Sequence, residues 1–170
     1  MAVTTAAAIR DRISAVITAL TPTVLSGDTF RESRNEYEGD FKKWAKAHAS
    51  ASLRRFQVRD SGKDGPAKSS NTTEEYRFIT WQVLVAYPTT HRYGAQAGLD
   101  LDDVKSADQH QIETAIGMRG GANFTGSNPN ADWTLDPPSP FAVPDTDTDR
   151  DDDAVHFLVI TQTMGYWRTM

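Results

Sequence analysis

The sequence predicts an α+β fold: a small, mostly antiparallel β-sheet with two helices packed on one face, and long loops. Three observations predict this fold. Two segments have apolar residues at helical spacing, two others alternate apolar and polar residues, and the order along the chain is helix, strand, helix, strand. Because 170 residues is the size of one domain, we expect a single domain, residues 1–170, with a long variable loop at about 118–153.

The first helix is expected at residues 5–20. Its isoleucine, valine and leucine residues recur at three- and four-residue spacing, and charged residues lie between them. Thr4 or Thr5 can cap this helix, and Pro22 ends it. The mixed, polar stretch that follows, residues 23–48, is expected to be mostly loop.

The weakest candidate strand covers residues 53–59. It alternates poorly and contains three arginines, Arg54, Arg55 and Arg59. We therefore expect it at an edge of the sheet or exposed to water on both faces. The next residues, 61–73, are rich in Gly, Pro, Ser and Lys, which predicts a loop.

The strongest strand signal lies at residues 78–87. Its apolar residues of one parity are Ile79, Trp81, Val83, Val85 and Tyr87. This alternation predicts a central strand that is buried on one face and partly on the other, and Pro88 ends it. A second long strand is expected at residues 155–167, where apolar residues also alternate.

The second helix is expected at residues 100–116. Its predicted apolar face consists of Leu101, Val104, Gln111, Ile112, Ala115 and Ile116. Asp100, Asp102 and Asp103 lie at its start, where the helix dipole favours anions, and Gly117 is placed to end it.

Composition excludes several classes of protein. The chain has no cysteine, so disulfide scaffolds, thiolate metal sites and cysteine nucleophiles are excluded. No apolar run is long enough for a membrane span, and Arg10, Asp11 and Arg12 interrupt the N-terminal apolar stretch, which is unlike a signal peptide. We expect a soluble protein made in the cytoplasm. The net charge of −5 argues against general binding to nucleic acid.

The charges are distributed unevenly along the chain. Residues 31–68 contain ten basic and six acidic residues, whereas residues 132–153 contain eight aspartates and one arginine. Opposite patches of this kind favour head-to-tail contacts between subunits or stacked rings, although two solvated loops would explain them equally well. The candidate contact residues are Arg54, Arg55, Arg59, Asp147, Asp149, Asp151, Asp152 and Asp153.

No motif predicts a catalytic, cofactor-binding or metal site. Residues 62–69 resemble a phosphate-binding loop, but Ala67 stands where that motif has glycine. The alternating aspartates from 145 to 151 resemble a calcium loop, but Arg150 replaces its glycine and His156 its glutamate. The four histidines lack metal-site spacing. We therefore expect a protein that is not an enzyme and has no cofactor, with a calcium-dependent binding module as a minor alternative.

The order of elements resembles the tail terminator (tail completion) proteins of long-tailed bacteriophages. The segments that carry the resemblance are the helix start Ala6-Ala-Ala-Ile-Arg-Asp-Arg-Ile13, the strand end Trp81-Gln-Val-Leu-Val-Ala-Tyr87-Pro, the helix Asp108-Gln-His-Gln-Ile-Glu-Thr-Ala-Ile116 and the C-terminal Tyr166-Trp167-Arg168. The resemblance covers most of the chain as a pattern of elements, without a diagnostic motif.

This resemblance implies a structural virion protein at the head–tail junction. It implies a homo-oligomeric ring, a hexamer, that caps the tail tube, stops its polymerisation and joins the tail to the head–neck connector. The expected partners are the chain itself, the tail tube protein and the connector protein, with DNA only as passing cargo in the lumen and no membrane. Another neck, connector or tail tube subunit is the alternative. An acidic loop lining the channel would repel passing DNA.

Overall fold

The computed structural model describes residues 5–33, 41, 52–60, 65–70, 74–88, 93, 100–117 and 155–169. Within these ranges the chain forms two helices and a five-stranded mixed sheet, which confirms the predicted α+β class. The elements are α1 (Ala6–Thr18), β1 (Thr29–Glu32), β2 (Leu53–Asp60), β3 (Gly65–Ser70), β4 (Glu74–Pro88), α3 (Leu101–Gly117) and β5 (Val155–Thr169).

Strand β4 is the centre of the sheet. It pairs with β5 in antiparallel register along all its residues, from Glu74 opposite Thr169 to Pro88 opposite Val155. It also pairs with β2 through its C-terminal half and with β3 through its N-terminal part, both antiparallel. The short β1 joins β2 in parallel. Sequence alternation therefore identified the strand that organises the sheet.

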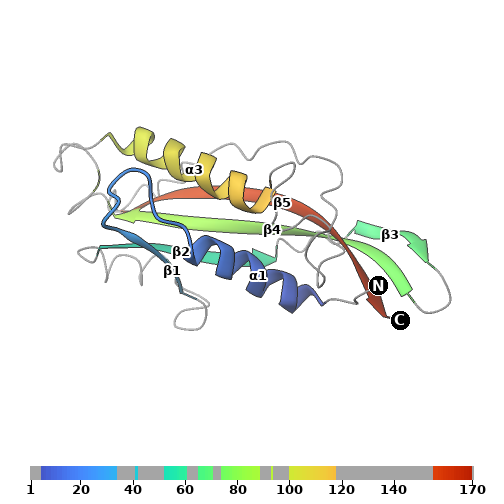
Figure 1. The fold of residues 1–170 in the computed structure, drawn as a ribbon. Helices are drawn as coiled ribbons and strands as arrows, with labels where there is room; N and C mark the ends of the chain where they lie inside the picture. The colour runs from blue at the N-terminus through green and yellow to red at the C-terminus, as the bar shows by residue number, and fades with distance from the viewer. Residues whose placement is uncertain are drawn as a thin grey trace.

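Both helices lie on one face of the sheet, as the sequence predicts (Figure 1). Helix α1 packs beside β1 and β2, and α3 packs beside β5. The strands are longer than this helical layer. Figure 1 shows β3, the start of β4 and the end of β5 projecting beyond it as a three-stranded arm.

The main core lies between the helices and the sheet. The α1 residues Ile9, Ile13 and Ile17 are fully buried, and so are Val83 and Val85 of β4. Burying one such side chain contributes about 1.5–3 kcal/mol, so each of these residues helps to hold the helices on the sheet. A smaller cluster on the other face contains Phe41, Ala86 and Val155, with Leu84 and Phe157 packed against it.

The helix starts follow the expected capping chemistry. The Thr5 side chain accepts a hydrogen bond of 3.1 Å from the backbone N–H of Ala8, which makes Thr5 the N-cap of α1. The helix ends at Thr18, before Pro22. At the start of α3, the Asp100 carboxylate accepts a bond of 3.0 Å from the N–H of Asp102.

Two predictions about the weaker segments are wrong. Strand β2 is not an edge strand, because it lies between β1 and β4 and its residues 54–58 are buried. Strand β3 lies in the predicted loop of residues 61–73. The stretch 23–48, expected to be mostly loop, contains the four-residue strand β1. The predicted long loop at about 118–153 lies outside the described residues.

Candidate functional site

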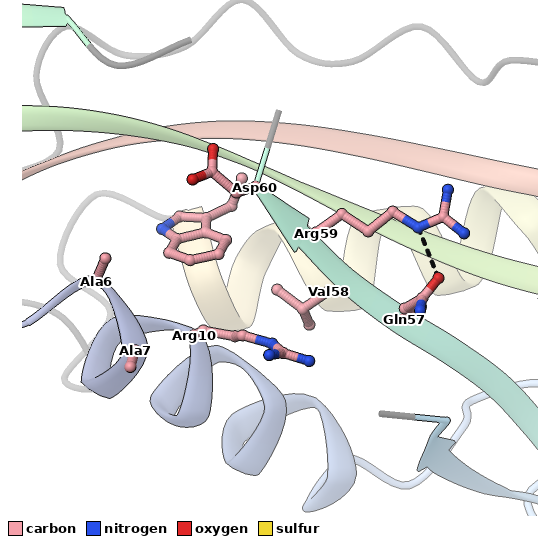
Figure 2. A pocket seen from close by; sticks show the side chains of 8 residues that line it. Ala6, Ala7, Arg10, Gln57, Val58, Arg59 and Asp60 are labelled. Atoms are coloured by element: carbon pink, nitrogen blue, oxygen red, sulfur yellow. Dashed lines mark hydrogen bonds between the residues drawn. The ribbon is translucent and has the colours of Figure 1, made fainter. Parts of the chain in front are cut away.

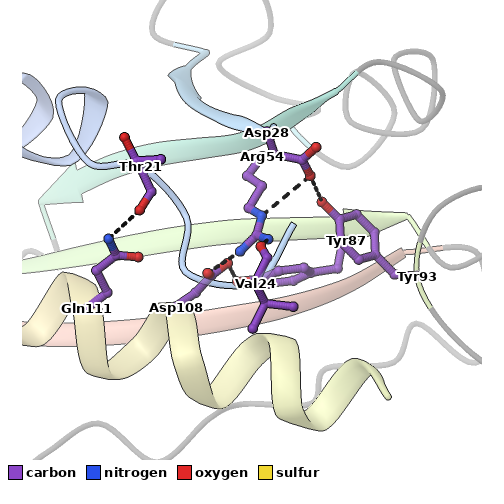
Figure 3. Close-up of polar contacts among 8 residues, drawn as sticks. All are labelled: Thr21, Val24, Asp28, Arg54, Tyr87, Tyr93, Asp108 and Gln111. Carbon is purple, nitrogen blue, oxygen red and sulfur yellow. Dashed lines mark hydrogen bonds and ion pairs between the residues drawn. The ribbon is translucent and has the colours of Figure 1, made fainter. Parts of the chain in front are cut away.

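A buried polar cluster centred on Arg54 lies between β2 and α3 (Figure 3). Strand alternation places Arg54 on the same face of β2 as Phe56 and Val58, under the helices, and its side chain is fully buried. Its guanidinium donates to the Asp108 carboxylate of α3 and to the backbone carbonyl of Val24.

A second carboxylate reaches the same arginine. The Asp28 Oδ2 atom lies 3.6 Å from the Arg54 Nε, and the Phe30 ring centroid lies 5.8 Å from the Arg54 Cζ. Val24 and Asp28 belong to one turn, in which Leu25 adopts a left-handed φ of 55°. This turn therefore presents both a carbonyl and a carboxylate to one guanidinium.

Two tyrosines complete the cluster. The Tyr87 hydroxyl donates to Asp108 Oδ2 at 2.8 Å, and the Tyr93 hydroxyl donates to Asp28 Oδ2 at 3.0 Å. The two rings meet edge to face, with centroids 5.4 Å apart. Each carboxylate thus has both a cationic and a phenolic partner, which is what a buried charge requires.

Burial shifts the ionisation of this cluster. Burial raises the pKa of the Asp108 carboxyl, and Arg54 and the Tyr87 hydrogen bond offset this only in part. Burial, together with the negative charge of Asp108, raises the pKa of Tyr87 far above its usual range. Burial lowers the pKa of Arg54, but Asp108 and the tyrosines raise it by more. Arg54 is therefore a permanent cation that holds Asp108 in place.

The chemistry of the Arg54 cluster is structural. Arg54, Asp108 and Tyr87 are fully buried and bonded to one another, so no reacting group is presented to a substrate. Instead the cluster joins β2, β4, α3 and the turn at residues 24–28. The cluster therefore fixes the position of α3 and of the turn relative to the sheet.

A cavity of about 550 Å³ lies between the first turn of α1 and the end of β2 (Figure 2). Its lining residues are Ala6, Ala7, Arg10, Gln57, Val58, Arg59, Asp60 and Trp81. In Figure 2, Arg10 extends from α1 toward β2, while Arg59 runs along the strand toward Gln57. The Arg59 Nε donates to Gln57 Oε1 at 2.6 Å.

The cavity is lined by hydrogen-bond donors. The Arg10 Nε and the Trp81 Nε1 are both buried and have no hydrogen-bond partner among the described residues, and Trp81 is only 3% exposed. The N–H groups of Ala6 and Ala7 belong to the first turn of α1, which has no intrahelical acceptors for them. Asp60, at the exposed end of β2, contributes the opposite charge. This arrangement suits a ligand with acceptor oxygens and one negative charge.

The structure separates the three arginines that the sequence analysis grouped as contact residues. Arg54 is fully buried, so its expected role as a surface contact is wrong. Arg55 is 6% exposed and lies in β2 on the face away from the helices. Arg59 is exposed and borders the cavity. Asp147, Asp149, Asp151, Asp152 and Asp153 lie outside the described residues.

Sequence reasoning missed Asp28, Asp108, Arg10 and Trp81 as parts of a site. The signal for Asp108 was present, because it lies four residues after Val104 and four before Ile112 on the apolar stripe of α3. A charged residue in that position predicts a buried partner. No comparable sequence signal identifies the cavity, which forms only when α1 packs against the end of β2.

Within the part of the chain that the structure describes, no three histidine, aspartate or glutamate side chains gather as a metal site. Neither helix among those residues has the length and apolarity to cross a lipid bilayer. No family model matches the sequence, and no curated protein is significantly similar to it.

Proposed function

We propose that this chain is a phage tail terminator, a structural subunit that forms a ring on the end of the tail tube and joins the tail to the head–neck connector. The observation that carries the proposal is the edge formed by β5. Among the described strands, β5 pairs only with β4, along its full 15 residues. A long open edge is a surface for pairing with another chain.

The sequence of β5 does little to protect this edge. Edge strands are usually blunted by charged side chains, proline, a bulge or short length. Between Val155 and Thr169 there is no proline, lysine or acidic residue, Arg168 is near the end of the strand, and the register with β4 is continuous. Such an edge suits a subunit whose neighbour covers it in the assembled form.

The projecting arm of β3, β4 and β5 supports the same proposal. Among the described elements, neither helix covers this arm in Figure 1, and a small set of strands needs a hydrophobic face or a packed layer to be stable in water. The arm includes Tyr76 opposite Trp167 in the register of β4 and β5, and Tyr166 opposite Arg77. An aromatic-rich ribbon that extends beyond its own helices suits contact with a neighbouring subunit or with the tube.

The test is the mass of the purified protein by light scattering, with negative-stain images of the protein alone and mixed with tail tubes. We expect closed rings that cap one end of the tubes. Rings that co-purify with filled heads but not with tubes would favour another neck or connector subunit. A strict monomer that ignores tubes would overturn the proposal.

A matched pair of variants tests the β5 edge itself. Thr161 in β5 and Thr80 in β4 are both half-buried and lie on the face away from the helices. Thr161→Lys places a charge on the edge strand and is expected to abolish rings. Thr80→Lys makes the same change on the central strand and is expected to leave them. Equal effects of the two variants would contradict a role for the edge.

A further inference from the structure

Two buried hydrogen-bond donors line the cavity beside Arg10. They are the Arg10 Nε and the Trp81 Nε1, neither of which has an acceptor among the described residues, and Trp81 is only 3% exposed. Buried polar atoms in folded proteins are almost always hydrogen-bonded to protein, water or a ligand. An indole N–H and a guanidinium can only donate, so the matching occupant brings acceptor atoms.

The charges on the cavity favour an occupant with a single negative charge. Arg10 supplies a guanidinium, which binds a carboxylate through parallel N–H bonds. The first turn of α1, at Ala6 and Ala7, adds N–H groups and the positive end of the helix dipole. Asp60 on the same cavity repels a second negative charge, which disfavours phosphate and dicarboxylates. The charges therefore select one carboxylate.

Strand register places apolar walls beside these donors. Val58 lies opposite Val83, and Asp60 lies opposite Trp81, so these side chains share the face of the sheet that α1 covers. Figure 2 shows Arg10 extending from α1 toward β2. At about 550 Å³, the cavity is in the size range of small-molecule sites, which are mostly apolar with a few placed polar groups. The methyl groups of Val58 and the indole of Trp81 therefore suit an apolar body next to the carboxylate.

We propose that this cavity binds a small organic acid that has one carboxylate and an apolar body. The carboxylate accepts hydrogen bonds from Arg10 and from the Trp81 Nε1, and the apolar body lies against Val58 and the indole. A free acid reaches these donors more readily than a carboxylate anchored on another protein, because both donor atoms are buried inside the cavity. The inference goes beyond the proposed ring subunit and does not depend on it.

Benzoate is the probe for this site, because it joins one carboxylate to an apolar ring. The chain has four tryptophans, so protein labelled with ¹⁵N-tryptophan gives four indole N–H signals in an NMR spectrum, and Trp81→Phe identifies the signal of Trp81. We expect benzoate to shift that signal in a saturable way. Benzamide has the same shape without the charge, and phthalate has a second carboxylate. Both are expected to bind at least about tenfold more weakly than benzoate.

Arg10→Met removes the guanidinium and keeps an apolar side chain of similar length. We expect this variant to bind benzoate at least about tenfold more weakly. Arg12→Met is the matched control. Arg12 is on the same helix, is similarly half-buried and also has a buried Nε without a partner among the described residues, but it does not line the cavity. It should bind benzoate as the wild type does, and the other three indole signals show whether each variant folds.

Three outcomes would overturn the inference. A Trp81 signal that does not respond to benzoate would leave water as the partner of the two donors. Equal binding of benzoate by Arg10→Met and the wild type would remove the guanidinium from the site. Rings that dissociate when benzoate is added, measured by light scattering, would assign the cavity to a contact between subunits, whereas we expect their mass to stay unchanged. A monomeric protein that binds benzoate would support this inference and overturn the proposed ring.

Discussion

Arg54 connects three parts of the chain that are far apart in sequence, namely β2, α3 and the turn before β1. Replacing Arg54 by Met removes the cation and leaves the fully buried Asp108 carboxylate without its ionic partner. We expect the free energy of unfolding to fall by about 3–5 kcal/mol, which denaturant titration measures. Arg59→Met removes an exposed arginine from the same strand and should cost about 0.5 kcal/mol or less. Similar losses in both variants would contradict the role of Arg54.

The pH dependence of the Arg54→Met variant tests the same cluster. In the folded wild-type protein, burial raises the pKa of Asp108 above its ordinary value of 3.8, and Arg54 opposes that shift. Without Arg54 the folded pKa rises further, so the folded state binds a proton more tightly than the unfolded state. Stability is then lost as pH rises from 3.8 through the folded pKa.

We therefore expect acidification from pH about 7 to about 5 to narrow the stability gap between Arg54→Met and the wild type. Denaturant titrations of both proteins across this range measure the gap. A gap that stays constant, or widens on acidification, would show that Asp108 does not carry the uncompensated charge in the variant.

At the level of single residues, the sequence predicts the apolar core better than the buried charges. Ile13 and Val83 were predicted from spacing and are fully buried. Arg54 was interpreted as exposed because its segment alternates poorly and contains three arginines, a residue type that is usually solvated. The partner of Arg54 is distant in the sequence. The pairing of Arg54 with Asp108 becomes evident only when β2 and α3 are placed in register.

Among the elements, α1 contributes residues to the core along its length, and its first turn lines the cavity. The Thr5 side chain caps this turn by accepting the N–H of Ala8. Thr5→Ala removes that acceptor and is expected to lower the free energy of unfolding by about 1 kcal/mol, whereas Thr5→Ser should keep most of it. Thermal or denaturant unfolding measures both. Thr18→Ala, at the other end of the exposed face, is the control, and a loss as large as that of Thr5→Ala would contradict the capping effect.

The sequence predicts long elements and misses short polar ones for a physical reason. β4 and β5 each have 15 residues, enough for alternation to be recognised. β1 has only four residues, and β3 has six, among them Gly, Pro, Lys and Ser. The strand conformation of β1 depends on pairing with β2, and that of β3 depends on pairing with β4. For such segments tertiary contacts outweigh local propensity.

In the whole molecule, the long edge of β5 is the surface on which the proposed ring depends. It offers backbone hydrogen bonds along the sheet, because among the described strands β5 pairs only with β4. Backbone pairing is little affected by salt, whereas attraction between exposed charges weakens as salt shortens its range. A ring held mainly by this edge should therefore persist at high salt.

This contact predicts a specific salt response. Between about 0.1 M and about 1 M salt the Debye length falls from about 10 Å to about 3 Å, so contacts between exposed charges are largely screened. We expect the protein concentration needed for rings to stay nearly unchanged over this range, because backbone pairing at the β5 edge does not depend on charge. Light scattering over a dilution series measures this concentration. A ring that dissociates as the salt concentration rises would contradict the β5 edge as the main contact and would assign that contact to charged side chains.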